Sequence, residues 1–241
     1  MKARELFQAG QLDAAIDALG VEVRDNPTDT QRRTFLFELL CFAGQYGRAE
    51  KHLDVLAQAG PQAGMGALLY GSALHACLTR DRMFKENAVP PVAAAAAEVS
   101  GTINGTPFSS LVDGDPRIGP RLEVFAAGQY TLLPLAHIAS LRMSPPTRLR
   151  DLMWPPAVLK TGPLFRGLDL GEVILPALTP LSAEDPNDHV RLGRVTEWRE
   201  LPDGTAIPVG QKMLLVDGEE YPILEVRELD IAPAAAPATT S

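Results

Sequence analysis

The sequence predicts a multidomain fold of α and α+β type, in which an N-terminal helical domain packs on a C-terminal mixed α+β domain. Three observations predict it: a motif that recurs in the first quarter, helical spacing of apolar residues that stops near residue 85, and hairpin patterns after residue 101. The predicted limits are 1–85 for the helical domain, 86–101 for a Pro- and Ala-rich connection, 102–230 for the α+β domain and 231–241 for a disordered tail.

The recurring motif has the period of a known helical repeat. Residues 10–15 read GQLDAA, residues 44–49 read GQYGRA 34 positions later, and Pro27 is matched by Pro61 at the same interval. Thirty-four residues is the period of the tetratricopeptide helix pair. Stacked helix pairs of this kind form concave surfaces that hold peptides and partner helices. The first part of the chain is therefore predicted to be tetratricopeptide-like and to bind other proteins.

Five helices are expected in this part. The second helix has an apolar face formed by Leu12, Ala15, Ile16, Leu19 and Val23. Thr28 and Gln31 have the spacing of a capping box, which predicts the start of the third helix. The third helix is apolar on most sides, with Phe35, Leu36, Leu39, Leu40 and Phe42.

The last two helices complete the helical part. The fourth helix carries an apolar stripe at Tyr46, Ala49, Leu53 and Leu56. The fifth helix is predicted over about 61–82, with inward-pointing Met65, Leu68, Leu69 and Ala76. Five helices amount to fewer than the ~3 repeats that an independent solenoid needs, so the rest of the chain is expected to cover the open end.

The C-terminal part is expected to alternate short strands and turns. A hairpin is predicted over 102–111, because Asn104-Gly105 is a strong turn signal. Residues 116–127 are predicted to form an amphipathic helix with Ile118, Leu122 and Phe125 on one side. The other expected elements are strands at 130–133, 138–143, 157–160 and 172–175, a helical turn at 147–154, and a hairpin of 213–216 with 221–226 around Asp217-Gly218.

Composition and charge exclude several classes of protein. Residues 1–85 carry equal numbers of acidic and basic side chains, so the net charge of −8 falls on residues 86–241. This distribution lacks the dense basic surface that nucleic acid requires, and it suits a basic partner. The sequence shows neither a membrane helix nor a signal peptide. Cys41 and Cys77 are interpreted as buried thiols in a reducing compartment, which predicts a cytoplasmic protein.

The sequence contains no motif for catalysis or metal binding, and no catalytic residue, cofactor or metal site is predicted. The four histidines are scattered, without the spacing of metal ligands. Asp113-Gly114-Asp115 begins like a calcium loop but lacks the later ligands, so a turn is the better interpretation. The alternative is a hydrolase or metal-dependent enzyme that uses the acidic side chains of the segment between Glu184 and His189.

Several segments taken together form a signature. They are 190–198 (VRLGRVTEW), 150–154 (RDLMW) and 210–214 (GQKML), supported by 115–123 and 218–225. Their order and spacing resemble the ImpE/TagJ family, accessory proteins of the bacterial type VI secretion system, over nearly the whole chain. The loops at 86–101 and 161–169 depart from the family pattern.

The resemblance implies a cytoplasmic, non-enzymatic adaptor with a tetratricopeptide-like helical domain and a C-terminal α+β domain. It also implies two partners. One is the small subunit of the contractile sheath, bound through its N-terminal helix. The other is the ClpV AAA+ ATPase, which disassembles the contracted sheath.

Two surfaces are candidates for binding the partner. The first is the concave side formed by the first and third helices, which suits an amphipathic helix. The second is a patch that takes its residues from the signature: Arg191, Arg194, Glu197, Trp198, Asp151 and Trp154. The alternative for this patch is structural, with both tryptophans in the core or at a domain junction and the arginines paired with acids such as Asp151. A purely structural dimerisation module is a third possibility, and the oligomeric state is not predicted.

Overall fold

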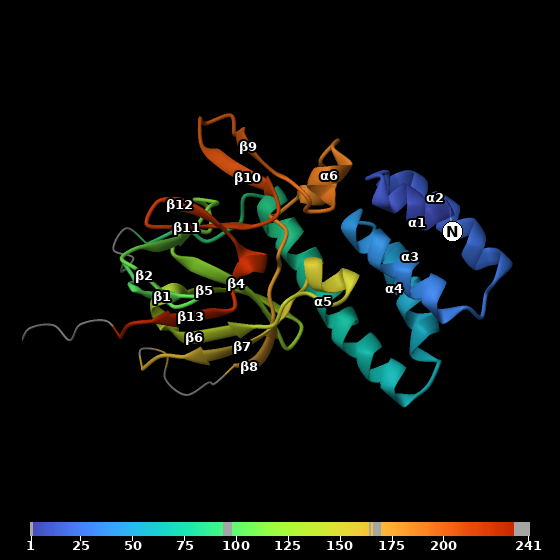
Figure 1. The fold of residues 1–241 in the computed structure, drawn as a ribbon, viewed down its shortest axis with the longest axis horizontal. Coiled ribbons are helices and arrows are strands. Elements are labelled where there is room, and N and C mark those ends of the chain that lie inside the picture. The colour runs from blue at the N-terminus through green and yellow to red at the C-terminus, as the bar shows by residue number, and fades with distance from the viewer. Residues whose placement is uncertain (1, 94–97, 164, 166–169, 234–241) are drawn as a thin grey trace, which may run out of the picture.

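The computed structural model describes residues 2–93, 98–163, 165 and 170–233 (Figure 1). Its helices are α1 (Lys2–Gln8), α2 (Leu12–Asp25), α3 (Thr30–Phe42), α4 (Tyr46–Ala57), α5 (Pro61–Lys85) and α6 (Asp188–Arg191). Helices α1–α5 lie on one side of the molecule and the strands on the other, with α5 between them (Figure 1). The five predicted helices are confirmed, and residues 234–241 of the predicted tail lie outside the described residues.

The two motif glycines end α1 and α3 at turns with left-handed backbone angles, φ +74° at Gly10 and +66° at Gly44. Glycine adopts such angles without steric cost. A β-carbon at Gly10 would lie 2.6 Å from Nε2 of His189, and one at Gly44 would lie 2.9 Å from Cβ of Ala183. Both turns are therefore covered by residues 182–194, which we call the covering segment.

The start of α3 differs from the prediction. Asp29 occupies the position before the helix, and its carboxylate accepts a hydrogen bond of 2.9 Å from the backbone N–H of Arg32. A capping side chain of this kind satisfies one of the free N–H groups of the first turn. The predicted capping box of Thr28 and Gln31 is therefore wrong by one residue.

The buried face of α5 also differs from the prediction. Met65, Leu68 and Leu69 are 70%, 75% and 51% exposed, so their inward placement is wrong, whereas Ala76 is fully buried. The reason is that no Asp, Glu, Lys or Arg occurs between residues 61 and 79, so apolar spacing alone does not identify one face. None of the described helices is long and apolar enough to cross a bilayer.

The strands of the described residues form three antiparallel sheets. The largest has the order β2-β1-β13-β6-β7-β8-β4-β5, and the smaller ones are β12-β11-β3 and β10-β9. The strand bounds are β1 (Gly101–Ile103), β2 (Thr106–Phe108), β3 (Leu111–Asp113), β4 (Arg121–Ala126), β5 (Gln129–Pro134), β6 (Ile138–Met143), β7 (Pro156–Thr161), β8 (Gly171–Ile174), β9 (Thr196–Glu200), β10 (Ala206–Gly210), β11 (Met213–Val216), β12 (Glu219–Pro222) and β13 (Glu228–Ile231).

Most of the predicted strands are confirmed. The hairpins that turn at Asn104-Gly105 and Asp217-Gly218 are present, and Asn104 and Asp217 both have positive φ. The last hairpin is shorter than predicted, because β12 ends at Pro222 and a 3₁₀ turn follows. The four other predicted strands correspond to β5, β6, β7 and β8, and the predicted helical turn is the 3₁₀ helix η2 (Leu149–Leu152).

The predicted helix at 116–127 is wrong, because this segment contains strand β4. Gly119 has a φ of +60° and Pro120 follows it, and this pair prevents a continuous helix. The strand is covered on both faces, so its apolar positions do not alternate. The buried positions in a row are Leu122, Glu123, Val124 and Phe125. Such a run fits helical spacing as well as it fits a strand.

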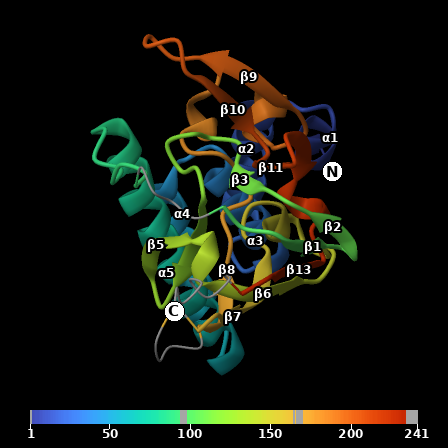
Figure 2. The ribbon, with the colours of Figure 1, turned by 90° about the vertical axis from the view of Figure 1, so that its left-hand side faces the viewer.

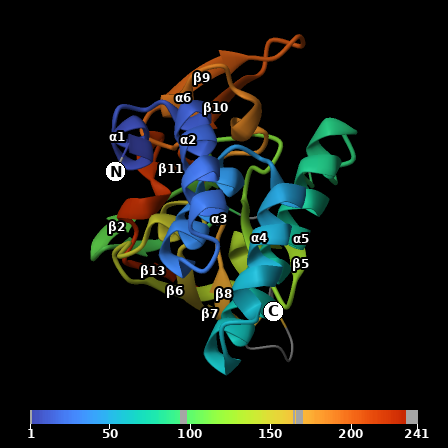
Figure 3. The ribbon, with the colours of Figure 1, turned by 90° about the vertical axis from the view of Figure 1, so that its right-hand side faces the viewer.

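The helices and the large sheet share a core. Figures 2 and 3 view the molecule from the strand side and from the helix side, and in both views α5 runs beside β5. The buried cluster of α2–α5 also includes residues from the later part of the chain, namely Phe125, Met153, Trp154, Ile174 and Leu192. The prediction that the rest of the chain covers the open end of the helices is confirmed.

A buried network of charges joins α5 to the strands. Nε and one terminal nitrogen of Arg80 donate to the two carboxylate oxygens of Glu123, each at 2.7 Å. Nζ of Lys212 lies 2.6 Å from Glu123 and 2.5 Å from Asp113. The hydroxyl of Tyr130 also donates to Glu123, at 2.7 Å. All four charged side chains are buried, so each depends on the others for the interactions that water would otherwise supply.

We expect Glu123→Gln to lower the free energy of unfolding by about 3–5 kcal/mol, because it leaves Arg80 and Lys212 buried with one carboxylate between them. Urea unfolding followed by circular dichroism measures this change. The control is Asp230→Asn, which removes the exposed ion pair with Arg142 and should cost less than about 1 kcal/mol. Equal losses from the two variants would contradict the importance of the network.

Acid should weaken the fold through the same carboxylate. Burial opposes ionisation of Glu123, but the attraction of Arg80 and Lys212 outweighs it and lowers the pKa of Glu123 to about 2. This pKa lies below the value of about 4.5 that the carboxyl has in the unfolded chain. The ionised carboxylate therefore stabilises the fold fully above about pH 4.5, and this contribution is lost as the pH falls towards 2. Urea unfolding at a series of pH values should show this loss in the native chain. The loss should be smaller in Glu123→Gln. If the free energy of unfolding falls equally steeply with pH in both chains, Glu123 is not the carboxylate responsible.

Candidate functional site

A groove lies between α1 and α3, on the side where the sequence predicts a partner-binding surface. Two adjoining cavities of about 530 and 540 Å³ form it. The residues common to both cavities are Arg4, Gln8, Gln31 and Phe35. Phe7, Thr30, Thr34, Glu38 and Leu149 complete one cavity. We call this feature the α1–α3 groove.

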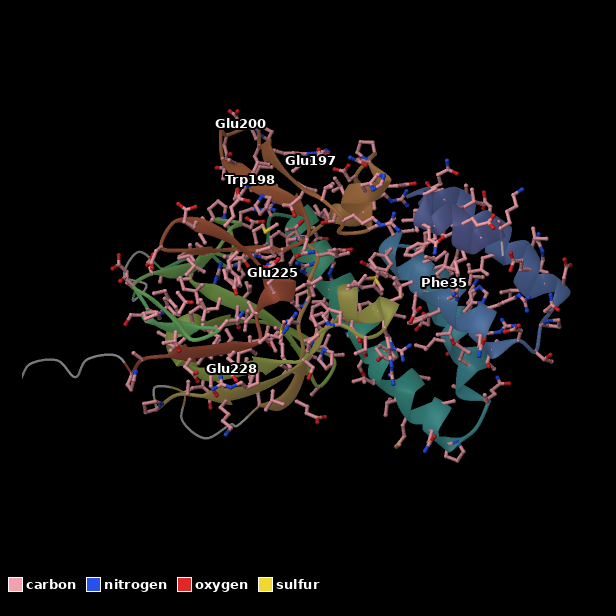
Figure 4. The ribbon with its side chains drawn as sticks, viewed as in Figure 1. Phe35, Glu197, Trp198, Glu200, Glu225 and Glu228 are labelled. Carbon is pink, nitrogen blue, oxygen red and sulfur yellow. The ribbon has the colours of Figure 1, made fainter. Side chains whose placement is uncertain are left out.

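Phe35 forms the apolar centre of the α1–α3 groove (Figure 4). Its ring meets the edge of Phe7 at a centroid distance of 5.6 Å, and the guanidinium of Arg4 lies 5.8 Å from its centre. Aromatic side chains that are only partly covered, with charged groups around them, are typical anchors for an amphipathic helix.

The remainder of the concave side is already occupied by the chain itself. The indole of Trp154 stacks on Tyr70 of α5 at 6.2 Å and lies 6.4 Å from Phe37 of α3. Arg150 lies over the ring of Tyr70 at 4.8 Å and donates to Glu38 at 3.1 Å. The segment that follows β6 thus fills the space between α3 and α5. The part between α1 and α3 remains open as a groove.

Arg191 and Arg194, predicted as partner-binding residues, contact the first helix pair. Arg191 donates to Asp13 at 2.9 and 3.1 Å and to Asp188 at 2.7 Å. Its hydrogen bond lowers the pKa of Asp13. Arg194 donates to the carbonyls of Phe7 and Gln8, at 2.7 and 3.0 Å, where α1 ends. The alternative in which the arginines pair with acids holds for Arg191, although its partners are Asp13 and Asp188 and not Asp151. Arg194 contacts backbone carbonyls instead.

Asp188 adds a further link between the covering segment and the helices. Its carboxylate accepts a hydrogen bond of 2.7 Å from the backbone N–H of Leu12, the first residue of α2. The residue before α2, Gln11, makes no side-chain cap of its own. An acid at a helix N-terminus is also favoured by the helix dipole. The start of α2 is therefore capped by a residue 176 positions later in the chain.

Glu197 and Trp198 lie on the β9–β10 hairpin, which projects from the rest of the molecule (Figures 1 and 4). Trp198 is 40% exposed, and its Nε1 donates to Glu220 at 2.8 Å. Glu197 accepts hydrogen bonds from Asn187 and Arg199, and the bond from Arg199 lowers the pKa of Glu197. This hairpin is a second exposed surface that combines an aromatic ring with acidic groups.

Asp151 and Trp154 lie away from that hairpin. Asp151 accepts hydrogen bonds from the backbone N–H groups of Thr147 and Arg148, each at 2.9 Å, so it stabilises the turn at η2. Trp154 is 5% exposed and belongs to the core that joins helices and strands. The structural alternative thus describes Trp154 correctly and Trp198 incorrectly, and the six predicted residues do not form one patch.

The acidic segment of the enzymatic alternative is engaged in structural contacts. Glu184 pairs with Lys85, and Asp185 lies 2.7 Å from Arg199. Asp188 contacts Leu12 and Arg191 as described above. In the part of the chain that the structure describes, no group of three or more His, Cys, Asp or Glu side chains could hold a metal ion.

The two cysteines are buried, as predicted, and they line a cavity of about 610 Å³ between α5 and residues 176–184. Burial raises the pKa of Cys41 well above its ordinary value and raises the pKa of Cys77 to about 12. A thiol with such a pKa is protonated at neutral pH and is a poor nucleophile.

Sequence reasoning located the α1–α3 groove but not the residues that form it. The helical spacing predicts Phe35 only as a packing residue of the third helix, and it gives Phe7 and Arg4 no role. The 28-residue interval between Phe7 and Phe35 is a weak signal, because it differs from the 34-residue period. Arg191 and Arg194 contact residues near position 10 that are far from them in the sequence, so no local sequence pattern predicts these contacts.

Comparison with known proteins adds the family context. Residues 105–230 match the model of a family described as ImpE protein. The chain is 33% identical, over 269 aligned positions, to the type VI secretion system accessory component TagJ of Pseudomonas aeruginosa, with 98% of this chain and 93% of that protein covered. The crystal structure of protein VPA1032 from Vibrio parahaemolyticus has the same fold. Its TM-score is 0.81 and its identity 24%, and the match covers 96% of this chain and 98% of that chain.

The different settings of the two tryptophans can be tested by fluorescence. In Trp154→Phe, the remaining Trp198 should emit at longer wavelength and be quenched readily by acrylamide, because its ring is partly exposed. In Trp198→Phe, the remaining Trp154 should emit at shorter wavelength and be quenched several-fold less. Equal quenching in the two variants would contradict these placements.

Proposed function

The chain belongs to the ImpE family, and its similarity to TagJ makes it an accessory protein of type VI secretion; on this premise we propose that it is a non-enzymatic adaptor. Its partner is the N-terminal helix of the small subunit of the contractile sheath, which binds in the α1–α3 groove. The adaptor assists the handling of that subunit by the ClpV AAA+ ATPase, and it acts in the cytoplasm.

The observation that supports this proposal is the chemistry of the groove. Phe35 and Phe7 supply an apolar centre, whereas Arg4 and Glu38 place charges of both signs among the lining residues. An amphipathic helix matches such a surface, because its apolar stripe covers the rings and its flanking charges meet the side chains around them. Arg4 suits an acidic residue of the helix, and Glu5, an exposed acid that lines the adjoining cavity, suits a basic one. Glu38 is buried and already paired with Arg150.

The second support is that the groove is held in position before any partner binds. Arg194 fixes the end of α1, and Leu149, the first residue of η2, forms part of the groove wall. A surface that is already ordered loses less conformational entropy on binding. In this proposal, the C-terminal part of the chain therefore contributes to affinity without contacting most of the partner helix.

The finer features of the fold belong to the same proposal. We propose that α1–α5 form a tetratricopeptide-like domain of residues 1–85, linked by 86–101 to an α+β domain of residues 102–230. Its helix pairs α1–α2 and α3–α4 end their first helices at glycines 34 residues apart, which supports the repeat. The partner-binding role of the patch around Trp198 stays a prediction, and the hairpin offers a separate surface for the ATPase.

The test is isothermal titration with a synthetic N-terminal helix of the sheath small subunit from the same organism. The native chain should bind one helix per chain. Phe35→Ala should weaken the affinity about thirtyfold or more, since truncating a central aromatic anchor costs at least ~2 kcal/mol. Thr34→Arg, which adds a bulky charge to the groove wall, should weaken it similarly.

The matched control is Trp198→Ala, which removes an exposed aromatic side chain outside the groove and should leave the affinity unchanged. Thermal unfolding of each variant separates loss of binding from loss of fold. The proposed site would be overturned by unchanged affinity in both folded groove variants. Absence of binding by the native chain at high micromolar peptide would overturn the proposed partner.

A further inference from the structure

A pocket that the proposed function does not use lies among α2, α3 and α4, on the helical side of the molecule (Figure 3). Its volume is about 490 Å³, and we call it the arginine pocket. The residues that line it are Gly20, Val23, Arg24, Pro27, Arg33, Leu36, Arg48 and His52. It shares no lining residue with the α1–α3 groove, so the inference drawn from it does not rest on the proposed function.

The arginine pocket carries charge of one sign only. Arg24 comes from α2, Arg33 from α3 and Arg48 from α4, and no Asp or Glu is among the lining residues. Within the described residues, none of the three arginines pairs with a carboxylate, whereas the adjacent Arg32 pairs with two. Three guanidinium groups therefore share a pocket without a counter-charge, in a chain whose net charge is −8.

His52 reports the positive potential of the pocket. Nη1 of Arg33 lies 3.3 Å from its Nδ1. Because a guanidinium only donates, Nδ1 accepts this bond and the ring carries its proton on Nε2. Burial is the main cause that lowers the pKa of His52, and the charges of Arg33 and Arg48 lower it further. The ring is therefore neutral at pH 7, and it adds one more N–H donor to the pocket.

We propose that the arginine pocket binds the phosphate group of a small soluble molecule. Guanidinium groups hold phosphate oxygens with charge-assisted, often paired, hydrogen bonds. Arg33 is held in position by the carbonyl of Pro27 at 2.7 Å, and Arg48 donates one bond to Gln45. The guanidinium of Arg24 has no partner in the described part of the chain, so all its donors are available to a ligand.

Two properties of the pocket favour a phosphate over a carboxylate. A phosphate monoester carries between one and two negative charges at pH 7 and offers three acceptor oxygens, whereas a carboxylate carries one charge and offers two oxygens. Donors that come from three helices match the larger number. The buried side chains of Val23 and Leu36 add apolar surface, which suits the carbon part of a small organic phosphate.

A phosphate in this position links the two helix pairs. Arg24 belongs to the second helix of the first pair, and Arg48 belongs to the second helix of the next pair. In the unfolded chain these side chains are not held together, so a ligand that binds them stabilises the native stack of helices. The ligand should therefore raise the melting temperature of the native chain.

The first test is isothermal titration with phenyl phosphate in a phosphate-free buffer of fixed ionic strength. The native chain should bind one molecule per chain with a dissociation constant of about 1 mM or lower. Arg48→Gln should weaken the affinity about tenfold or more, because it removes a charged donor. The matched control is Lys51→Gln, which removes the same charge from an exposed residue of α4 outside the pocket and should change the affinity less than about twofold. Thermal unfolding shows that each variant is folded.

Two further probes define the ligand. Benzoate has the same ring with a carboxylate, and it should bind about tenfold more weakly than phenyl phosphate. Inorganic phosphate distinguishes the two sources of the phosphate group. Affinity equal to that of phenyl phosphate would identify free phosphate as the ligand, and weaker affinity would identify a monoester whose carbon part contacts the apolar surface.

Nuclear magnetic resonance of the histidine rings locates the site. Phenyl phosphate should shift the ring signals of His52, which are assigned by their loss in His52→Gln. The signals of the other histidines should stay in place, since His75, His137 and His189 do not line the pocket. The proposal would be overturned by a lack of saturable binding up to about 10 mM, by equal affinity for benzoate, by equal affinities of the Arg48→Gln and Lys51→Gln chains, or by unshifted signals of His52.

Discussion

The buried contact of Arg80 with Glu123 is the constraint on which the arrangement of the molecule depends. Two more charges, on Lys212 and Asp113, complete the network, and all four side chains are buried. A helix that brings one charge into such a network can neither rotate nor slide along the sheet without leaving charges unpaired. The orientation of α5 is therefore fixed. It places Tyr70 against Trp154 and turns Met65 and Leu68 to the surface.

Local signals account for the parts of the fold that sequence reasoning predicts correctly. Helix ends at Gly10 and Gly44, and hairpin turns at Asn104 and Asp217, depend on neighbouring residues and on backbone angles that few residue types adopt. The errors have a different origin. Strand β4 is buried on both faces, and α5 lacks charges over most of its length, so in both cases the pattern that distinguishes faces is missing. Only the partners of these elements determine which side chains are covered.

The candidate site combines predictable and unpredictable components. The helical period indicated a concave surface between the first and third helices, and the open groove lies there. The period does not indicate that Trp154 and Arg150 fill the adjoining space, because their contacts with α3 and α5 join residues 80 or more positions apart. The residue types around Arg191 predict a binding patch, yet Arg191 contacts the start of α2 and Arg194 contacts the end of α1. The signature segment around Arg191 in this chain thus lies where the strands meet the helices α1 and α2.

The covering segment also limits how this helical array can evolve. Open solenoids gain and lose repeats readily, because each repeat contacts only its neighbours. Here one segment contacts the turn at Gly10 through His189 and the turn at Gly44 through Ala183. An extra helix pair inserted between them would carry one turn out of reach. The covering segment therefore permits only one spacing between these two turns. Insertion of a helix pair would require a matching change in the length of the covering segment.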